Sequence, residues 1–373
     1  HMDLIERSPA HVRAIAPYQP GKPISELARE MGIDEHKIIK LASNENPLGL
    51  SPRARVAIEQ AVDDLARYPD GNAFELKAAL ARHYGVEPKC MVIGNGSNDI
   101  LELVAGALLT QGSSAVYSRH AFAVYQLAIQ GRGARGILVP AKDYGHDLDG
   151  MAAAVTKDTK IVFIANPNNP TGTHLSGAAL EAFLQRVPAD VAVVLDEAYN
   201  EYLPPEARTD SIAWLAKYRN LIISRTFSKA YGLAGLRVGY GFMAPEVADL
   251  LNRLRQPFNV NSLALAAATA ALGDAEFVRH SYELNRQGMA QLERGLRELG
   301  LNWIKSCGNF ISFELPRKNG QPQAPLVYQS LLKLGVIVRA IGAYEMPDHL
   351  RVTVGTMEEN HIFLSALKKA MAS

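Results

Sequence analysis

Short apolar runs alternate with longer amphipathic runs through the middle of the chain. Runs such as Val191–Leu195 are apolar at every position, which is typical of parallel strands covered by helices on both faces. Gly177–Val187, preceded by the good N-cap residue Ser176, has the length of a helix that connects two parallel strands. The pattern therefore predicts an α/β fold, with a mostly parallel central sheet flanked by helices. The predicted strands are Cys90–Ile93, Ala115–Ser118, Gly136–Val139, Ile161–Ala165, Val191–Leu195, Leu221–Ser224 and Val238–Phe242.

Capping signals mark two helices that precede this region. Ser51-Pro52 has the residue types expected at an N-cap and at the first helical position. Asn72, followed three residues later by Glu75, resembles a capping box, and Gly85 is suited to end that helix. A further helix is predicted at about Asp99–Leu109, directly after the first strand.

The pattern changes after about residue 258, where long helices and short strands no longer alternate regularly. The predicted helices are Ser262–Leu272, Ala275–Leu299, Pro325–Leu334 and one from about Glu358, and the predicted strands are Asn302–Ile304, Phe310–Leu315, Val336–Arg339 and Leu350–Val354. We expect a large α/β domain over residues 47–258. A smaller α+β domain would combine residues 1–46 with residues 259–373, because the N-terminal segment is too short to fold alone.

Composition narrows the possible partners and the compartment. The net charge is +1, with 39 basic and 38 acidic residues, so nothing indicates a nucleic-acid or membrane-surface partner. No secretion signal or membrane-spanning run is found, and His1-Met2 resembles a cloning remnant. The two cysteines, Cys90 and Cys307, form no metal-binding motif. We expect them to be inert core thiols in a cytoplasmic protein without a metal.

Lys229 lies at the end of Ser224-Arg-Thr-Phe-Ser-Lys229, directly after a predicted strand. Ligand sites in α/β sheets lie at the carboxyl ends of the strands. Apolar neighbours would lower the pKa of this lysine, as a lysine that forms a Schiff base requires. Thr226 and Ser228 supply hydroxyls and Arg237 a guanidinium, a set suited to a phosphate. An ordinary surface lysine is the alternative from this segment alone.

Two neighbouring strands also end in polar residues. Asp196 follows Val191–Leu195, where an unpaired carboxylate would be costly. It would therefore bind a metal, contact a charged cofactor atom or form a structural salt bridge. Asn169, in Asn166-Pro-Asn-Asn-Pro-Thr-Gly172, can donate to a ligand oxygen, or the segment can simply form a turn.

Glycine-rich segments give one candidate anion site. Gly94-Asn-Gly-Ser-Asn98 joins a strand to a helix and would expose backbone N–H groups at the helix N-terminus. A literal GxGxxG at Gly131, Gly133 and Gly136 follows a helix and precedes a strand instead. This order is wrong for a dinucleotide site.

Arg339 and Arg351 each lie in a predicted apolar strand near the C-terminus. An arginine buried there requires a specific anionic partner, whereas one on an exposed face or edge does not. Both interpretations stay open from the strands alone.

Five blocks, in order along the chain, resemble the fold-type-I pyridoxal-phosphate aminotransferases of class II. The resemblance extends from Leu41 to Gly355, over nearly the full length. It implies the fold-type-I architecture and pyridoxal 5′-phosphate as cofactor. The blocks are Arg67-Tyr-Pro69, Asn166-Pro-Asn-Asn-Pro-Thr-Gly172, Asp196-Glu-Ala-Tyr199, Thr226-Phe-Ser-Lys229 and Gly235-Leu-Arg237.

The resemblance also implies roles for single residues. Lys229 would hold the cofactor as a Schiff base and move the substrate's proton. Asp196 would keep the ring nitrogen protonated, and Asn169 and Tyr199 would hydrogen-bond the ring's phenolate oxygen. Phe122 would stack on the ring where relatives commonly have a tyrosine, so the stacking remains and the hydroxyl is lost.

The phosphate ligands implied by the resemblance are Ser97, Asn98, Thr226, Ser228 and Arg237. Tyr68 would reach the phosphate from the neighbouring subunit, which makes the active unit a homodimer. Arg351 would bind the anionic end of the substrate with Arg339 close by, and Tyr18 and Asn44 would close over the site.

The implied reaction transfers the amino group of L-histidinol phosphate to 2-oxoglutarate in histidine biosynthesis, giving imidazole acetol phosphate and glutamate. The segment Arg339-Ala-Ile-Gly-Ala-Tyr-Glu-Met-Pro347 departs from the family pattern, which leaves a broad-specificity aromatic amino acid aminotransferase as an alternative. A decarboxylase of a phosphorylated amino acid is another. A degenerate binding protein is disfavoured by the intact Lys229.

Overall fold

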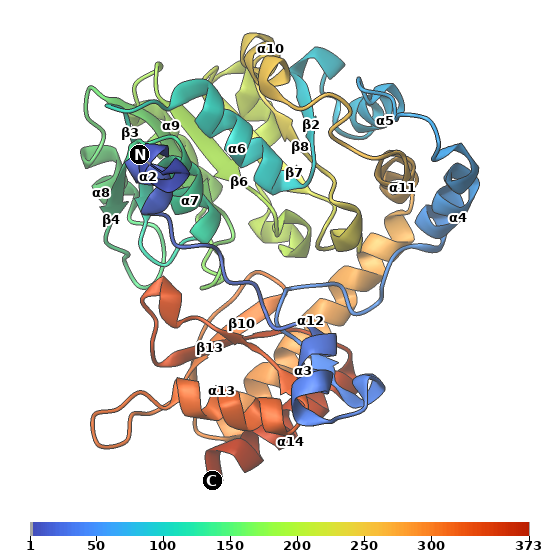
Figure 1. The fold of residues 1–373 in the computed structure, drawn as a ribbon, viewed down its shortest axis with the longest axis vertical. Helices are drawn as coiled ribbons and strands as arrows, with labels where there is room; N and C mark the ends of the chain where they lie inside the picture. Colours follow the sequence, from blue (N-terminus) through green and yellow to red (C-terminus); the bar gives the residue numbers. More distant parts are fainter. Residues whose placement is uncertain (1–2, 373) are drawn as a thin grey trace.

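The computed structural model describes residues 3–372, so that His1, Met2 and Ser373, including the expected cloning remnant, lie outside the described residues. A seven-stranded sheet with the order β2-β8-β7-β6-β5-β3-β4 forms the upper half in Figure 1. Only β8 runs antiparallel to its neighbours, which confirms the predicted, mostly parallel sheet. The strands are β2 (Met91–Gly94), β3 (Ser114–Ser118), β4 (Arg135–Val139), β5 (Thr159–Ala165), β6 (Ala192–Asp196), β7 (Leu221–Thr226) and β8 (Gly239–Phe242).

Both faces of this sheet are covered by helices, because its strands are apolar at successive positions. In β6, Val193 and Leu195 pack in one apolar cluster, whereas Ala192 and Val194 pack in the other, on the opposite face. The first cluster includes residues of α4 (Pro52–Ala61), α5 (Phe74–Tyr84), α8 (Leu148–Ala153), α9 (Gly177–Arg186) and α11 (Ser262–Leu272). The second includes residues of α6 (Ser97–Leu108), α7 (Ala123–Gly131) and α10 (Pro245–Leu254).

The predicted helix caps are right in part. The Ser51 hydroxyl accepts a hydrogen bond from the Ala54 N–H at 3.0 Å and so caps α4, as predicted. The left-handed Gly85 (φ 70°) ends α5, also as predicted. The capping box at Asn72 is wrong. The carboxylate of Asp70, two residues earlier, accepts from the N–H groups of Asn72 and Phe74, both at 2.9 Å, and thereby satisfies the donors at the start of α5.

A second, four-stranded antiparallel sheet has the order β12-β13-β10-β9 and forms the lower half in Figure 1. The strands are β9 (Asn302–Ile304), β10 (Phe310–Glu314), β12 (Arg339–Ala340) and β13 (His349–Thr353). They pack with α12 (Ala275–Glu298), α13 (Ala324–Lys333) and α14 (Met357–Ala372). The long α12 begins beside α11 and extends into the lower half (Figure 1).

The predicted strand at residues 336–339 is two strands in two sheets. β11 (Val336–Ile337) pairs in parallel with β1 (Ile39–Lys40) of the N-terminal segment, and β12 joins the antiparallel sheet. The backbone therefore changes partners within one apolar run. Apolarity alone does not specify a hydrogen-bonding partner, which is why the sequence showed one strand.

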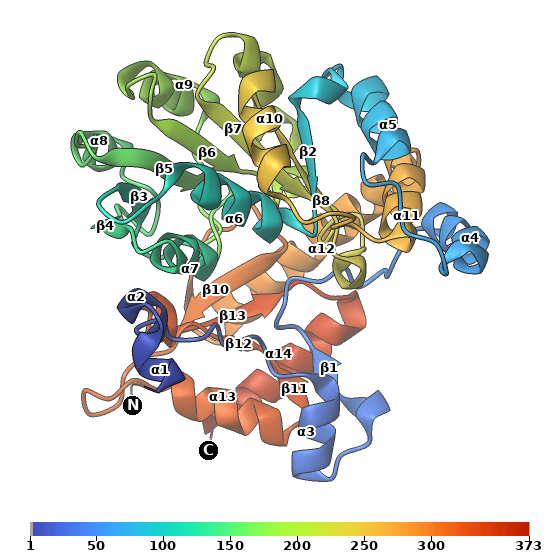
Figure 2. The ribbon, with the colours of Figure 1, turned by 45° about the horizontal axis from the view of Figure 1, so that its top comes forward.

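The N-terminal segment contacts both halves of the molecule. Leu27 of α3 (Ile24–Met31) packs with Ile38, Leu332 and Ile337 on the C-terminal part. The short helices α1 (Leu4–Arg7) and α2 (Ala10–Arg13) instead lie beside the upper half, where α2 contacts α7 (Figure 2). Residues 3–46 thus do not pack as one unit on the C-terminal part, and residues 15–23 cross between the two halves.

Short 3-10 helices complete the connections. They are η1 (Glu35–Lys37), η2 (Val62–Asp64), η3 (Pro88–Cys90), η4 (Asn200–Tyr202), η5 (Pro205–Ala207), η6 (Ser211–Ala216), η7 (Ala234–Leu236) and η8 (Gly342–Tyr344). Cys90 and Cys307 are free thiols and only half-buried, so the prediction that they are core residues is wrong. Cys90 lies in η3 and packs against the edge of an apolar cluster, and Cys307 lies in a loop.

A buried ion pair lies under the carboxyl end of the large sheet. The Nε and Nη2 atoms of Arg225 in β7 each lie 3.1 Å from Oε1 of Glu197, which follows β6. Both residues are 4% exposed, and the Ser211 hydroxyl also donates to the Glu197 carboxylate, at 2.9 Å. Removing one ion would leave the other buried without a counter-charge.

We therefore expect Arg225→Met to lower the free energy of unfolding by about 3–5 kcal/mol, measured by urea denaturation. The double variant Arg225→Met/Glu197→Gln should lose less, because Glu197 no longer remains as a carboxylate without its counter-charge. Arg253→Met, which breaks the exposed pair with Asp249, should change stability by no more than about 0.5 kcal/mol. Equal losses in Arg225→Met and Arg253→Met would contradict the role of the buried pair.

Candidate active site

A cavity of about 440 Å³ lies at the carboxyl ends of β5, β6 and β7, between the large sheet and the four-stranded sheet. It brings together every predicted site residue except Tyr68, although these residues come from segments far apart in the sequence. The predicted residues that line it are Tyr18, Asn44, Ser97, Asn98, Phe122, Asn169, Asp196, Tyr199, Thr226, Ser228, Lys229, Arg237, Arg339 and Arg351.

Tyr68 does not line the cavity of its own chain. Its side chain is 82% exposed, and its ring stacks on Phe258 with centroids 4.7 Å apart. The prediction that Tyr68 serves the site of a second copy stays a prediction.

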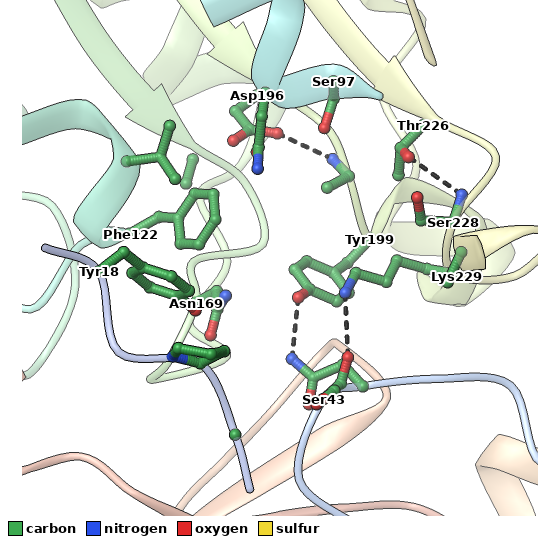
Figure 3. A pocket seen from close by; sticks show the side chains of 18 of the residues that line it. Tyr18, Ser43, Ser97, Phe122, Asn169, Asp196, Tyr199, Thr226, Ser228 and Lys229 are labelled. Carbon is green, nitrogen blue, oxygen red and sulfur yellow. Dashed lines mark hydrogen bonds between the residues drawn. The ribbon is translucent and has the colours of Figure 1, made fainter. Parts of the chain in front are cut away.

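Lys229 follows β7 and points across the cavity toward the N-terminal segment. Its Nζ donates to the backbone carbonyl of Ser43 at 3.1 Å and lies 5.6 Å from the centre of the Tyr199 ring (Figure 3). Burial, followed by the positive charge of Arg351, lowers the pKa of Lys229 from 10.5 to about 8. A substantial fraction of this amine is therefore neutral near physiological pH, as predicted from its apolar surroundings.

Asp196 is the last residue of β6, and its carboxylate is held by two donors. The Tyr125 hydroxyl donates to Oδ2 at 2.6 Å, and the Ala198 N–H donates to Oδ1 at 3.1 Å. Burial raises the pKa of Asp196, and these two hydrogen bonds oppose that rise. Sequence reasoning missed Tyr125, because a tyrosine in the apolar helix α7 gives no sign of where its hydroxyl lies.

The N-terminus of α6 forms an open cradle beside Arg237. Gly96 (φ 84°) precedes the helix and provides no side-chain cap, so the N–H groups of Ser97 and Asn98 are not capped by a side chain and are suited to an anion. A Cβ at Gly96 would collide with the Arg237 guanidinium. Arg237 Nη1 donates to the Ser228 hydroxyl at 3.1 Å, which holds both groups at the cradle. The hydroxyls of Ser97 and Thr226 also line the cavity.

Arg351 in β13 is 5% exposed, and its guanidinium has neutral partners. Nη1 donates to Asn169 Oδ1 at 2.6 Å, Nη2 donates to the Ala42 carbonyl at 2.7 Å, and Nε has no partner within the described chain. Among residues 3–372, no carboxylate forms an ion pair with Arg351. Its positive charge is therefore uncompensated, which is suited to an anionic ligand.

Tyr199 and Asn44 are linked by a hydrogen bond under the cavity. Asn44 Nδ2 donates to the Tyr199 hydroxyl at 2.8 Å, and Asn44 Oδ1 accepts from the Thr353 hydroxyl at 3.0 Å. The nitrogen and the oxygen of the Asn44 amide thus each have a hydrogen-bond partner within the chain. Burial raises the pKa of Tyr199 to about 12, so its hydroxyl remains protonated and can donate to a ligand oxygen.

The mouth of the cavity is lined by Arg339 and by the crossing N-terminal segment. The guanidinium of Arg339 lies 5.5 Å from the centre of the Tyr18 ring and donates to the Gln19 carbonyl. Tyr18 is 43% exposed, which leaves this side of the cavity accessible. Phe122 lines the inner wall, where its ring meets that of Tyr125 edge-on. Figure 3 shows Tyr18 and Phe122 on the side of the cavity opposite Lys229.

Two features do not occur within residues 3–372. Within that range, no helix is both long and apolar enough to cross a membrane. The same residues contain no group of three or more His, Cys, Asp or Glu side chains placed to hold a metal ion.

Comparison with known proteins identifies the class. Residues 36–367 match the family Aminotransferase class I and II, and the chain belongs to this family. It is 60% identical over 370 residues to histidinol-phosphate aminotransferase 2 of Nitrosospira multiformis, covering 99% of this chain and 93% of that protein. It is also 60% identical over 368 residues to histidinol-phosphate aminotransferase of Methylobacillus flagellatus, covering 99% and 98%.

A solved structure of another histidinol-phosphate aminotransferase has the same fold as this chain. The crystal structure of histidinol-phosphate aminotransferase from Sinorhizobium meliloti in complex with pyridoxal-5′-phosphate superposes with a TM-score of 0.91. It is 29% identical, and the match covers 100% of this chain and 99% of that one. The predicted fold-type-I architecture is thereby confirmed.

The lowered pKa of Lys229 leads to a labelling prediction. Amine-reactive trinitrobenzenesulfonate attacks only the neutral amine, so labelling of Lys229 should rise with pH through a midpoint of about 8. Exposed Lys217, whose pKa is raised by its hydrogen bond to Glu181, is an internal control with a higher midpoint. Peptide mass spectrometry over a pH series measures both. Arg351→Gln should move the Lys229 midpoint upward, because a repelling charge is lost. A wild-type midpoint near 10.5 would rule out the assigned environment.

Proposed function

We propose that this chain binds pyridoxal 5′-phosphate at Lys229 and transfers the amino group of L-histidinol phosphate to 2-oxoglutarate. The products are imidazole acetol phosphate and glutamate, and the step belongs to histidine biosynthesis. The observation that carries the proposal is one cavity that combines a lysine of lowered pKa, an anion cradle and a buried uncompensated arginine. Full-length relatives at 60% identity named histidinol-phosphate aminotransferase support it.

The residues present fit this cofactor. The uncapped start of α6, Arg237 and the hydroxyls of Thr226 and Ser228 suit its phosphate, and the absence of a side chain at Gly96 lets the Arg237 guanidinium approach the start of α6. The cradle also includes Ser97 and Asn98. When bound, pyridoxal phosphate supplies an electron-withdrawing ring that stabilises negative charge on the carbon bearing the amine.

Three side chains would orient the cofactor ring. The carboxylate of Asp196 would hold the ring nitrogen in its protonated form, since an anion favours a nearby positive charge. Tyr199 would donate its hydroxyl to the ring's phenolic oxygen, and Asn169 can do the same with Nδ2, because its Oδ1 already accepts from Arg351. Phe122 would lie against the face of the ring.

The chain's own groups account for binding and proton transfer. Lys229 would accept the proton from the substrate carbon and return it to the cofactor, for which a pKa of about 8 is well matched to neutral pH. Arg351 would bind the anionic end of each substrate, a phosphate in histidinol phosphate and a carboxylate in 2-oxoglutarate. A guanidinium suits both anions, so one residue can serve both halves of the reaction.

We also propose a cytoplasmic homodimer. Large apolar side chains that are at least 46% exposed support a protein–protein contact at this part of the chain, and they are Val56, Val62, Leu65, Tyr68, Phe74 and Phe258. Tyr68 would then reach the phosphate in the partner's site. The free thiols support a reducing compartment. Within each subunit, residues 47–258 would form the cofactor-binding domain, together with α1, α2 and α11, which pack beside it, and the smaller domain would consist of α3 and β1 with the chain from α12 onward.

The substrate assignment is tested by comparing kcat/KM for histidinol phosphate, phenylalanine and tyrosine, each with 2-oxoglutarate. We expect histidinol phosphate to give the highest value, because its phosphate would contact Arg351 and Arg339. A higher value for either aromatic amino acid would support the broad aromatic aminotransferase instead. Release of CO2 without glutamate would support the decarboxylase.

Subunit mixing tests the shared site. Lys229→Ala and Tyr68→Ala should each show little turnover, the first without its proton-transfer amine and the second without a phosphate ligand. After subunit exchange, a mixed dimer would contain one site with both residues intact, so mixing should restore part of the wild-type activity. Each variant mixed with itself is the control. No recovery despite proven exchange would place Tyr68 outside the partner's site.

A further inference from the structure

Tyr125 lies in the first turn of α7, and its side chain is fully buried. Its hydroxyl nevertheless points into the candidate active site. Its hydroxyl donates to Asp196 Oδ2 at 2.6 Å, a short charge-assisted hydrogen bond. The residue also lines the cavity. The roles proposed above do not use it.

The ring of Tyr125 is fixed by packing on two sides. It stacks on Phe163 of β5 with centroids 5.0 Å apart and planes within 10°, and it meets Phe122 edge-on, with centroids 5.9 Å apart at 88°. These aromatic contacts hold the phenol in one rotamer. The position of its hydroxyl is therefore set by the packing of α7 on the large sheet.

This fixed hydroxyl determines how Asp196 is presented. Each oxygen of the carboxylate has its own donor, Tyr125 on Oδ2 and the Ala198 N–H on Oδ1, so the plane of the carboxylate is defined. Burial raises the pKa of Tyr125 well above 10.0, so the phenol remains protonated and must donate. A donor favours the ionised acceptor. Of the other charged groups that face Asp196, Glu197 opposes its ionisation and Lys229 favours it.

We propose that Tyr125 is a positioning residue, which holds Asp196 as an oriented carboxylate against the cofactor's ring nitrogen and supports Phe122 against the ring face. One side chain would thereby fix two contacts of the cofactor without touching the substrate. The inference rests on the proposed cofactor, and it extends the proposed function to a residue that no family block contains.

The test compares wild-type holoenzyme with Tyr125→Phe, which keeps the stacking and removes the hydroxyl. We expect kcat to fall about tenfold, from the loss of one hydrogen bond to a charged group, with KM for the amino donor little changed. The cofactor should also dissociate more readily. The pH midpoint of its visible absorption band should rise, because a less positive ring nitrogen repels the proton on the lysine linkage less strongly.

Tyr240→Phe is the matched control. Tyr240 is equally buried, and its hydroxyl contacts the hydroxyl of Tyr84 at 3.3 Å rather than a cavity residue. This variant should leave kcat and the pH midpoint at their wild-type values. A shift of the same size in Tyr240→Phe would mean that buried hydroxyls act through general stability, which would overturn the proposal.

A double-mutant cycle shows whether Tyr125 acts through Asp196. In an Asp196→Asn background, Tyr125→Phe should change cofactor dissociation by less than about twofold, because the carboxylate it holds is already gone. Equal effects in both backgrounds, or no effect of Tyr125→Phe in either, would overturn the proposal. Cofactor dissociation and the absorption midpoint need no substrate. If the assigned substrate is wrong, the comparison of kcat/KM among amino donors will show it. The expected effects on cofactor dissociation and on the absorption midpoint would remain.

Discussion

The positive charge of Arg351 is buried among neutral hydrogen-bond acceptors, and the site is organised around it. Its guanidinium joins three segments, because β13 carries the residue, Asn169 follows β5, and Ala42 belongs to the N-terminal segment. Amide and carbonyl oxygens accept hydrogen bonds from its Nη1 and Nη2 atoms without cancelling its charge, and its Nε has no partner among the described residues. A carboxylate in their place would neutralise the arginine and remove its attraction for an anion. The same charge helps to keep Lys229 partly neutral.

The large sheet provides the other half of this electrostatic arrangement. Its strands are apolar on both faces, so polar groups at their carboxyl ends lie next to a core of low polarizability, where each charge acts strongly on its neighbours. Lys229 and Asp196 consequently have shifted pKa values in opposite directions. Each shift favours the neutral form, and the hydrogen bonds of Asp196 oppose its shift by favouring the carboxylate.

Several local predictions succeeded because they rest on short-range chemistry. Ser51 and Gly85 act at helix ends through their own side chain or backbone, and the apolar runs of the large sheet required two covered faces. The failures involve competition between neighbours or distant partners. Asp70 satisfies the donors that a capping box at Asn72 would have used. The apolar run at residues 336–339 is shared between two sheets, and Cys90 and Cys307 are only half-covered.

Local residue patterns predicted the α/β class, the strand ends that carry Asp196 and Lys229, and a helix from about Asp99 that in fact begins at Ser97, because hydrophobic periodicity and strand-to-helix turns are local properties. The resemblance of five sequence blocks to the pyridoxal-phosphate aminotransferases predicted the cofactor and most of the residues that would bind it. Only the tertiary structure decided that Asn44 holds Tyr199, that Arg351 has no counter-charge, and that the Tyr125 hydroxyl reaches Asp196. Those contacts join residues from 71 to 309 positions apart. Their existence depends on how helices and sheets pack, and no local pattern of residues encodes that.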